Sequence, residues 1–512
     1  MAAGVTASAL GVGNRMGGAP VLKNGYVTVS NFNGTVKGVL EILSPLASRG
    51  DPDIYRAYQI WSAAKRGTRL YREGRFELLT PAEIKDALTL EQKYPEFVTV
   101  QQDWIKYNNA LVKMQVDGGV ITKEAGVEFM KYSDYIPLYR QMDGRTTLGP
   151  SVYQSISGVK PPKALKGKST EPIEDYLETI VRNTQAAIQS TMKNVAAQKA
   201  VKNGMMLENG KKVSYQCADK LFIEAVSSLN LPELPFLSIL SAPADLLRTL
   251  VTKDPGFMLA NMMRDSLSAY VTSGANIKPV ISTVQNVGAA MMNRSPIYQA
   301  LLNSGAIGGY EYSRNVEAGA DAFAADLRRK TGTETGSEKL FKPFTKVWGF
   351  LERGTEISDA ATRMAVYEAT LKETGNEAEA IRRAVEVLNF NRKGRSAVVR
   401  IVAAAIPFLN ARVQGLDVFF RAGIRPFYDK NSTAYEKQVQ KAMLIRGATM
   451  MALSTMYAAA IMGDPDYEKQ EQETKDNNWL IPSLGIKIPI PFEVGTLFKT
   501  IPERIYRYSY GS

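Results

Sequence analysis

The sequence contains no histidine and only one cysteine, Cys217, in 512 residues. Without histidine the chain has no Ser-His-Asp triad, no Cys-His pair and no imidazole ligand for a metal ion. A single cysteine forms no disulfide within the chain and no thiolate zinc site. These absences exclude the commonest catalytic and metal-binding arrangements. We therefore expect no enzymatic activity, no catalytic residues, no metal and no cofactor.

The N-terminus lacks the cationic segment and following apolar run that mark a secretion signal. Residues 1–30 are instead rich in glycine and alanine, and we expect a flexible arm there. The glycines between residues 11 and 18 do not have the spacing of a dinucleotide-binding loop, and no predicted strand precedes them.

One cluster of carboxylates needs a separate assessment. Glu352, Glu356 and Asp359 lie along one side of a predicted helix. A pair of carboxylates is what a peptidoglycan-cleaving glycosidase uses. The favoured interpretation is a charge network on the helix surface with Arg363 as the partner, because no glycosidase motif surrounds the pair.

Charge and apolar content indicate a large core and anionic partners. Hydrophobic residues make up 45% of the chain, the formal net charge is +12 and the pI is about 9.3. That balance favours nucleic acid or an anionic membrane surface, with a mildly basic soluble protein as the alternative. The cations that we single out as polyanion contacts are Lys160, Lys163, Lys166, Lys168, Arg392, Lys393 and Arg395.

The periodicity predicts a mainly α, elongated assembly of many helices with one or two small β-hairpins. Thr80 and Glu83 form a predicted capping box, and Gly118 with Gly119 ends a helix. The hairpins are expected around residues 205–215 and 479–491.

Composition divides the chain into five predicted regions. They are a flexible Gly/Ala-rich arm (1–30), an N-terminal helical region (31–148), a basic Pro-rich linker (149–171), a middle helical region with a small hairpin (172–330), and a C-terminal helical region with apolar helices and a basic aromatic tail (331–512).

Two stretches in the C-terminal region are unusually apolar. Residues 397–422 read as two apolar helices hinged at Pro407, behind a cationic entrance. Residues 434–462 form the second stretch, long enough to cross a bilayer although Arg446 lies inside it. Burial in a helical bundle is the favoured interpretation, and conditional insertion into a membrane is the alternative. The candidate membrane or assembly residues are Val398, Ile401, Pro407, Phe408, Asn410, Gln414, Phe419, Arg446, Gly447, Met451 and Met456.

Several ordered motifs resemble one known family. They are DPGFMLANMMRDS at residues 254–266, LERGTEISDAATRMAVYEAT at 351–370, NFNRKG at 389–394, IPFLNARVQGLD at 406–417, and PIPFEVG followed by IPER at the end. Together they resemble the domain associated with large polyvalent proteins of tailed phages, over roughly residues 150–507. The motif residues to which we give structural roles are Pro255, Phe257, Asn261, Arg264, Asp265, Asn389 and Asn391.

The resemblance implies a function. Such domains also occur in internal virion proteins of short-tailed phages, which leave the capsid with or before the DNA. By this resemblance we expect an ejection protein, packaged in the capsid interior and delivered into the host cell envelope to help form a conduit for the genome. Expected partners are other virion proteins including portal or core, double-stranded DNA, the host membrane, and further copies of the chain. The alternatives are a soluble DNA-binding or scaffold protein of the capsid interior, and a peptidoglycan-degrading virion enzyme.

Overall fold

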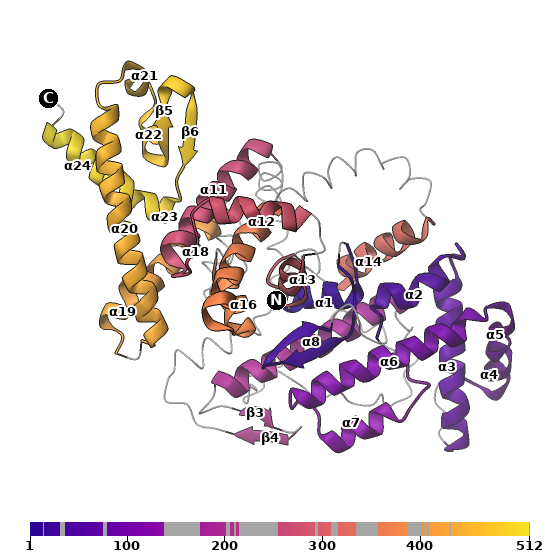
Figure 1. Cartoon of the computed structure of the whole chain (residues 1–512). Helices are drawn as coiled ribbons and strands as arrows, with labels where there is room; N and C mark the ends of the chain where they lie inside the picture. Colours follow the sequence, from indigo (N-terminus) through magenta and orange to yellow (C-terminus); the bar gives the residue numbers. More distant parts are fainter. Residues whose placement is uncertain are drawn as a thin grey trace. The chain divides into compact units, whose positions relative to one another are not determined.

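The structure is a computed structural model that describes residues 1–13, 15–30, 36–74, 79–137, 175–200, 205–208, 211–214, 254–291, 295–308, 316–333, 357–387, 402, 406, 409–430 and 432–510. It is mainly α-helical with small antiparallel hairpins, as predicted (Figure 1). Contacts divide the chain into two units, each discontinuous in sequence. Unit 1 comprises Met1–Pro232 with Leu302–Lys342, and unit 2 comprises Glu233–Leu301 with Pro343–Ser512.

The helices of the first two hundred residues are α1 (Ala2–Leu10), α2 (Val39–Ala47), α3 (Ile54–Arg72), α4 (Pro81–Leu88), α5 (Leu90–Lys93), α6 (Glu96–Asp117), α7 (Lys123–Met130) and α8 (Tyr176–Ala200). They are followed by α11 (Pro255–Thr272), α12 (Ile281–Met291), α13 (Pro296–Asn303), α14 (Val316–Thr331), α16 (Glu377–Glu386), α18 (Leu409–Phe419), α19 (Arg425–Tyr428), α20 (Ala434–Ile461), α21 (Pro465–Glu468), α22 (Gln472–Asn477), α23 (Phe492–Gly495) and α24 (Ile501–Tyr510). Residues 357–374 are also helical. Two π-helical segments, η3 (Phe420–Ile424) and η5 (Thr496–Thr500), and the 3₁₀ turn η4 (Pro482–Leu484) complete the set.

The strands form three two-stranded antiparallel hairpins within the described residues: β1 (Pro20–Lys23) with β2 (Tyr26–Val29), β3 (Met205–Glu208) with β4 (Lys211–Ser214), and β5 (Asn478–Ile481) with β6 (Ile486–Pro489). The second and third confirm the predicted hairpins. The first was not predicted. Its turn places both Asn24 and Gly25 at positive φ, which is the backbone that a two-residue hairpin turn requires.

The prediction of a flexible arm at residues 1–30 is wrong. Helix α1 is buried along most of its length and packs against α8. A Cβ on Gly4 would lie 2.7 Å from Gly305 Cα, and the Ser8 hydroxyl donates to the Leu302 carbonyl at 3.0 Å. The small residues therefore serve close backbone packing rather than mobility. Composition alone does not separate these two uses of glycine and alanine.

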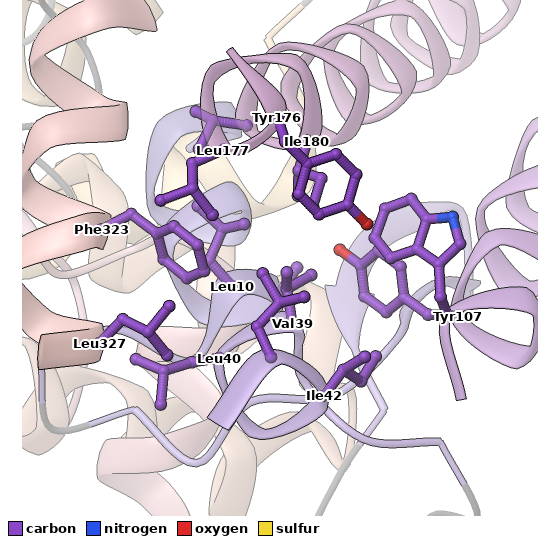
Figure 2. Close-up of a cluster of buried hydrophobic side chains, with 14 of the residues drawn as sticks. Leu10, Val39, Leu40, Ile42, Tyr107, Tyr176, Leu177, Ile180, Phe323 and Leu327 are labelled. Atoms are coloured by element: carbon purple, nitrogen blue, oxygen red, sulfur yellow. The ribbon is translucent and has the colours of Figure 1, made fainter. Parts of the chain in front are cut away.

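The core of unit 1 gathers side chains from six helices: α1, α2, α3, α6, α8 and α14. Figure 2 shows Leu10 of α1, residues of α2, Tyr107 of α6, residues of α8, and Phe323 with Leu327 of α14 converging on one cluster. The buried Tyr58 hydroxyl donates to Gln101 Oε1 at 2.7 Å, which satisfies both polar groups inside this core.

Predicted helix starts are confirmed where capping side chains are present. Thr80 and Glu83 make the reciprocal bonds of a capping box at α4. Asp254 Oδ2 accepts from the Phe257 amide at 2.7 Å and caps α11, with Pro255 at the first helical position. These caps lie where the sequence placed them because the bonds are local and need no tertiary partner.

Unit 2 has two small cores. One joins Val271 of α11, Phe419, Met443 and Met450 with Val494 of α23. The other joins Ala269 and Ile277 to Val366 of the helix at 357–374 and to Val387. Helix α20 runs past both α11 and the C-terminal helices, which makes it the long element of this unit (Figure 1).

Candidate functional site

Helix α20 is the element on which the candidate site is built. It begins at a capping box in which the Thr433 hydroxyl accepts from the Glu436 amide and the Glu436 side chain accepts from Thr433. Its buried residues recur every three or four positions, as expected for one helix face. They are Val439, Met443, Gly447, Met450, Ser454 and Ala458.

The opposite face of α20 is apolar and exposed. Ile445 and Met456 are 58% and 68% exposed, and Leu444, Met451 and Leu453 are exposed as well. The helix is long and apolar enough to cross a membrane, yet only 22% of its most apolar window is buried. Bulky apolar side chains thus lie on the exposed face of α20, whereas half of the residues on the packed face (Gly447, Ser454 and Ala458) have small side chains. Within unit 2 the packed face of α20 agrees with the favoured interpretation of burial in a bundle, whereas the outer face is not covered.

Arg446, the one charged residue between positions 442 and 462, is half-buried and turned toward α11. Its guanidinium donates to the carbonyls of Tyr270 and, at 3.0 Å, Ala275, and lies over the Tyr270 ring at 4.6 Å. Both carbonyls are at or just beyond the C-terminal end of α11, where the helix dipole favours a cation. Because the Arg446 guanidinium points toward α11, the outer face of α20 carries no charged side chain from Leu444 to Met462.

A second exposed apolar group lies beside the N-terminal half of α20. Segment η3 packs on the helix, and Gln440 Nε2 donates to the Gly423 carbonyl at 2.9 Å. From η3 and α19, Phe427 and Tyr428 are 69% and 62% exposed, and Phe420 and Ile424 are exposed too. Figure 1 shows α19 at the N-terminal end of α20 and α21 at its C-terminal end.

The last helical stretch, from α23 through η5 to α24, also turns apolar side chains outward. Leu497, Ile501, Ile505 and Tyr508 recur at helical spacing and are exposed, Tyr508 to 92%. We call these four residues the outer stripe of α24. The sequence here predicted family motifs and a basic aromatic tail, but not an exposed apolar stripe. The spacing of Leu497, Ile501 and Ile505 was the signal that could have predicted the stripe.

The inner side of the same stretch carries a buried ion pair. Lys499 Nζ lies 2.9 Å from Glu503 Oε2 and also donates to the Lys475 carbonyl. Both side chains are almost fully buried. Burial raises the pKa of Glu503 to about 7 and lowers the pKa of Lys499, so desolvation outweighs the attraction between them. Charges inside and apolar groups outside are the reverse of an ordinary soluble helix.

Three contacts join this stretch and the β5–β6 hairpin to α20. The Phe498 ring covers Gly447, and the Tyr457 hydroxyl donates to the Leu480 carbonyl at 3.1 Å while accepting from the Leu480 amide at 2.9 Å. Nearby, Tyr467 is buried with Arg507 over its ring at 4.3 Å. α20 and the C-terminal helices therefore form one packed layer.

A buried polar cluster ties α11 to α23. The Ser268 hydroxyl donates to Glu493 Oε1 at 2.8 Å, and Asn261 Nδ2 donates to Asp265 Oδ2 at 3.0 Å. Burial raises the pKa of Asp265 well above its usual range, and the carboxylates of Asp359 and Glu493 raise it further. Among the described residues, no group of carboxylates is arranged to hold a metal ion.

The structure places some of the predicted residues and not others. Gln414 and Phe419 are buried, whereas Met451 and Met456 lie on the exposed face of α20. Asp359 and Arg363 pair at 3.1 Å, as the charge-network interpretation expects. Asn410 of α18 and Arg264 of α11 are half-buried. Fifteen predicted positions lie outside the described residues: Lys160, Lys163, Lys166, Lys168, Glu352, Glu356, Asn389, Asn391, Arg392, Lys393, Arg395, Val398, Ile401, Pro407 and Phe408.

One comparison with known proteins gives a match. Residues 464–511 match the family model of large polyvalent protein associated domain 38, which confirms the suspected family for this segment and indicates a phage-associated protein. The segment contains α21 to α24 with the β5–β6 hairpin, and so includes the Lys499–Glu503 pair and the outer stripe. The other motifs that carried the resemblance precede it. No curated protein and no solved structure matches the chain.

Proposed function

We propose that this phage-associated protein is an internal virion protein without catalytic activity. It is packaged in the capsid interior and is delivered into the host envelope, where it binds membrane and helps form the conduit for the genome. Assembly with other virion proteins and with further copies of itself belongs to the same proposal. The membrane-binding element is the exposed face of α20 together with the outer stripe of α24.

The observation that carries the proposal is the inverted distribution of side chains on α20. Leu444, Ile445, Leu453 and Met456 face outward. The inner face holds the small residues Gly447, Ser454 and Ala458 together with Val439, Met443 and Met450. In a bilayer the driving force for apolar packing between helices is lost, so small residues line helix contacts and bulky apolar residues face lipid. Polar groups are then paired inside, as Arg446 and the Lys499–Glu503 pair are.

The exposed apolar residues offer a substantial free energy for membrane attachment. Transfer of one large apolar side chain from water contributes about 1.5 to 3 kcal/mol. Five such residues on α20 and four on the outer stripe of α24 are exposed. If half of that area reaches the hydrocarbon, the gain is on the order of 10 kcal/mol, which is comparable with the loss of freedom on binding.

The test is flotation of the full-length chain with neutral phosphatidylcholine vesicles in low and high salt, combined with dye release. Binding through apolar contact is insensitive to salt, whereas binding through surface charge is screened. A fourfold variant, Leu444→Asn, Ile445→Asn, Leu453→Asn and Met456→Asn, is expected to lose flotation and leakage. The control replaces four residues exposed elsewhere, Met16→Asn, Ile60→Asn, Val127→Asn and Leu259→Asn, and should bind as the wild type does.

Absence of flotation for the wild-type chain at both salt concentrations would contradict the membrane role. Equal losses in the fourfold variant and its control would assign the binding to general surface apolarity rather than to α20. Circular dichroism of both variants checks that the helices are retained.

A further inference from the structure

We infer that α20 meets the membrane at its N-terminal end, where Lys430, Lys437 and Lys441 with Phe427 and Tyr428 form a patch for anionic phospholipid headgroups. We call these five residues the headgroup patch. The inference rests on the proposed membrane binding and adds the chemistry and the direction of the contact.

The lysines of the patch are placed for this role. Lys437, Lys441 and Leu444 follow one another at helical spacing, so the two ammonium groups lie on the face that becomes apolar one turn later. Lys430, Lys437 and Lys441 are exposed, and none forms an ion pair with another described residue. A lysine at the edge of an apolar helix face lays its methylene chain along the hydrocarbon and keeps its ammonium at the headgroups.

The aromatic residues of the patch add interfacial contact. Phe427 and Tyr428 are the most exposed apolar side chains between residues 409 and 430. They belong to α19, which packs on α20 just before the lysines. Aromatic rings concentrate at the boundary between hydrocarbon and headgroups. A short helix that exposes two rings beside unpaired lysines therefore matches a lipid interface.

The opposite end of α20 has the reverse charge. The residues between 463 and 476 contain six carboxylates, Asp464, Asp466, Glu468, Glu471, Glu473 and Asp476, against Lys469 and Lys475. Both of these lysines are paired, with Asp466 at 2.9 Å and Glu468 at 3.1 Å. An anionic surface repels this end and attracts the other, so charge alone orients the helix.

Duplex DNA presents phosphates as well, but the surroundings favour lipid. A phosphate backbone in water does not offset the exposure of Phe427, Tyr428, Leu444 and Ile445, whereas a bilayer boundary accepts rings, aliphatic groups and ammonium groups together. DNA binding is therefore treated as a competing outcome of the test.

The experiment compares vesicles of phosphatidylcholine alone with vesicles containing 30 mol% phosphatidylglycerol. Each lysine near an anionic surface strengthens partitioning about fivefold, so the three together contribute on the order of 100-fold at low salt. The variant Lys430→Gln, Lys437→Gln, Lys441→Gln should lose this increment and keep its binding to neutral vesicles. The control Lys85→Gln, Lys123→Gln, Lys487→Gln removes the same charge from three other exposed lysines and should keep the increment.

A fluorescent probe locates the end that binds. In a Cys217→Ser background, an environment-sensitive dye is attached to Tyr428→Cys or to Asp466→Cys. The emission of the dye at position 428 is expected to shift to shorter wavelength on anionic vesicles, and that of the dye at position 466 is expected to stay unchanged.

Equal shifts at the two positions, or an equal loss of binding in both lysine variants, would overturn the inference. The inference would also be overturned if the Lys430→Gln, Lys437→Gln, Lys441→Gln variant lost duplex DNA binding and kept its vesicle binding unchanged. If the chain binds neutral vesicles but phosphatidylglycerol adds nothing, the inference fails while the proposed function stands; no binding to any vesicle removes the proposed function itself.

Discussion

The Phe498 ring lies directly over the Cα of Gly447, so closely that a Cβ at position 447 would come within 2.5 Å of the ring. The ring itself is held against Phe419 at a centroid distance of 5.9 Å. The absence of a side chain at one position of α20 therefore defines where the domain at residues 464–511 docks. Small residues have this role at helix contacts in bilayers as well as in water.

Replacement of Gly447 by valine should loosen this docking. The added methyl groups overlap a ring that has little room to move, and such overpacking destabilises by about 1 to 3 kcal/mol. Hydrogen exchange measured by mass spectrometry should show faster exchange in Thr496–Thr500 and Ile501–Tyr510, because these segments lose their support. Ala448→Val places the same branched side chain on the exposed neighbour and controls for helix propensity. Equal exchange in both variants would mean that Phe498 moves aside freely.

The buried pair Lys499–Glu503 gives a prediction that depends on pH. In the wild type, the raised pKa of Glu503 makes its contribution to stability greatest below about pH 4.5, and that contribution is lost as the pH rises toward 7. Lys499→Met leaves the carboxylate buried without its cation. At pH 8 this should lower the free energy of unfolding by about 3 to 5 kcal/mol, and at pH 5 by much less because the carboxyl group is then protonated.

The double variant Lys499→Met, Glu503→Gln removes both charges and should regain most of the stability at pH 8. Urea unfolding at the two pH values measures all three proteins. A single variant that is equally unstable at pH 5 and pH 8 would show that lost packing of the lysine chain, rather than stranded charge, determines the effect.

Features that depend on neighbouring residues could be predicted from the sequence, and features that depend on residues distant in the sequence could not. Capping boxes at Thr80 and the cap at Asp254 were predictable because donor and acceptor are three residues apart. The long apolar helix was predictable for the same reason, since its composition is local. Its exposure was not, because which face of a uniformly apolar helix is covered depends on Phe498, Tyr270 and other residues distant in the sequence. The buried N-terminal helix was missed because its partners, α8 and the Leu302 carbonyl among them, lie far from it in the sequence.

Ionisation of the buried Asp265 carboxyl group should destabilise unit 2 at neutral pH. Its raised pKa means that the folded protein holds the proton more tightly than the unfolded chain does, so stability is lost as the pH rises above about 4. Asp265→Asn stays neutral at every pH and keeps an oxygen for the Asn261 amide. The variant should be more stable than the wild type at pH 8 and similar to it at pH 4 in thermal unfolding. Asp254→Asn, an exposed cap at which both residues serve equally, is the control and should change little. A destabilised Asp265→Asn at pH 8 would instead show that the ionised carboxylate is needed by Arg264 or Arg363.

Arg446 distinguishes insertion of α20 from attachment along its outer face. Arg446→Leu removes the donor from the Tyr270 and Ala275 carbonyls, which should lower the free energy of unfolding by about 1 to 3 kcal/mol. The same change removes the only charge between residues 442 and 462. An arginine within an inserted helix opposes insertion by up to about 3 kcal/mol, so the leucine variant should partition into neutral vesicles about tenfold or more tightly if α20 enters the bilayer. If only the outer face touches lipid, the guanidinium stays in the protein and partitioning changes little.

The control Thr449→Leu adds apolar area on the exposed face and leaves the guanidinium in place, and so measures the effect of apolar area alone. Flotation of Arg446→Leu well above that of Thr449→Leu indicates insertion, and equal flotation indicates a peripheral contact.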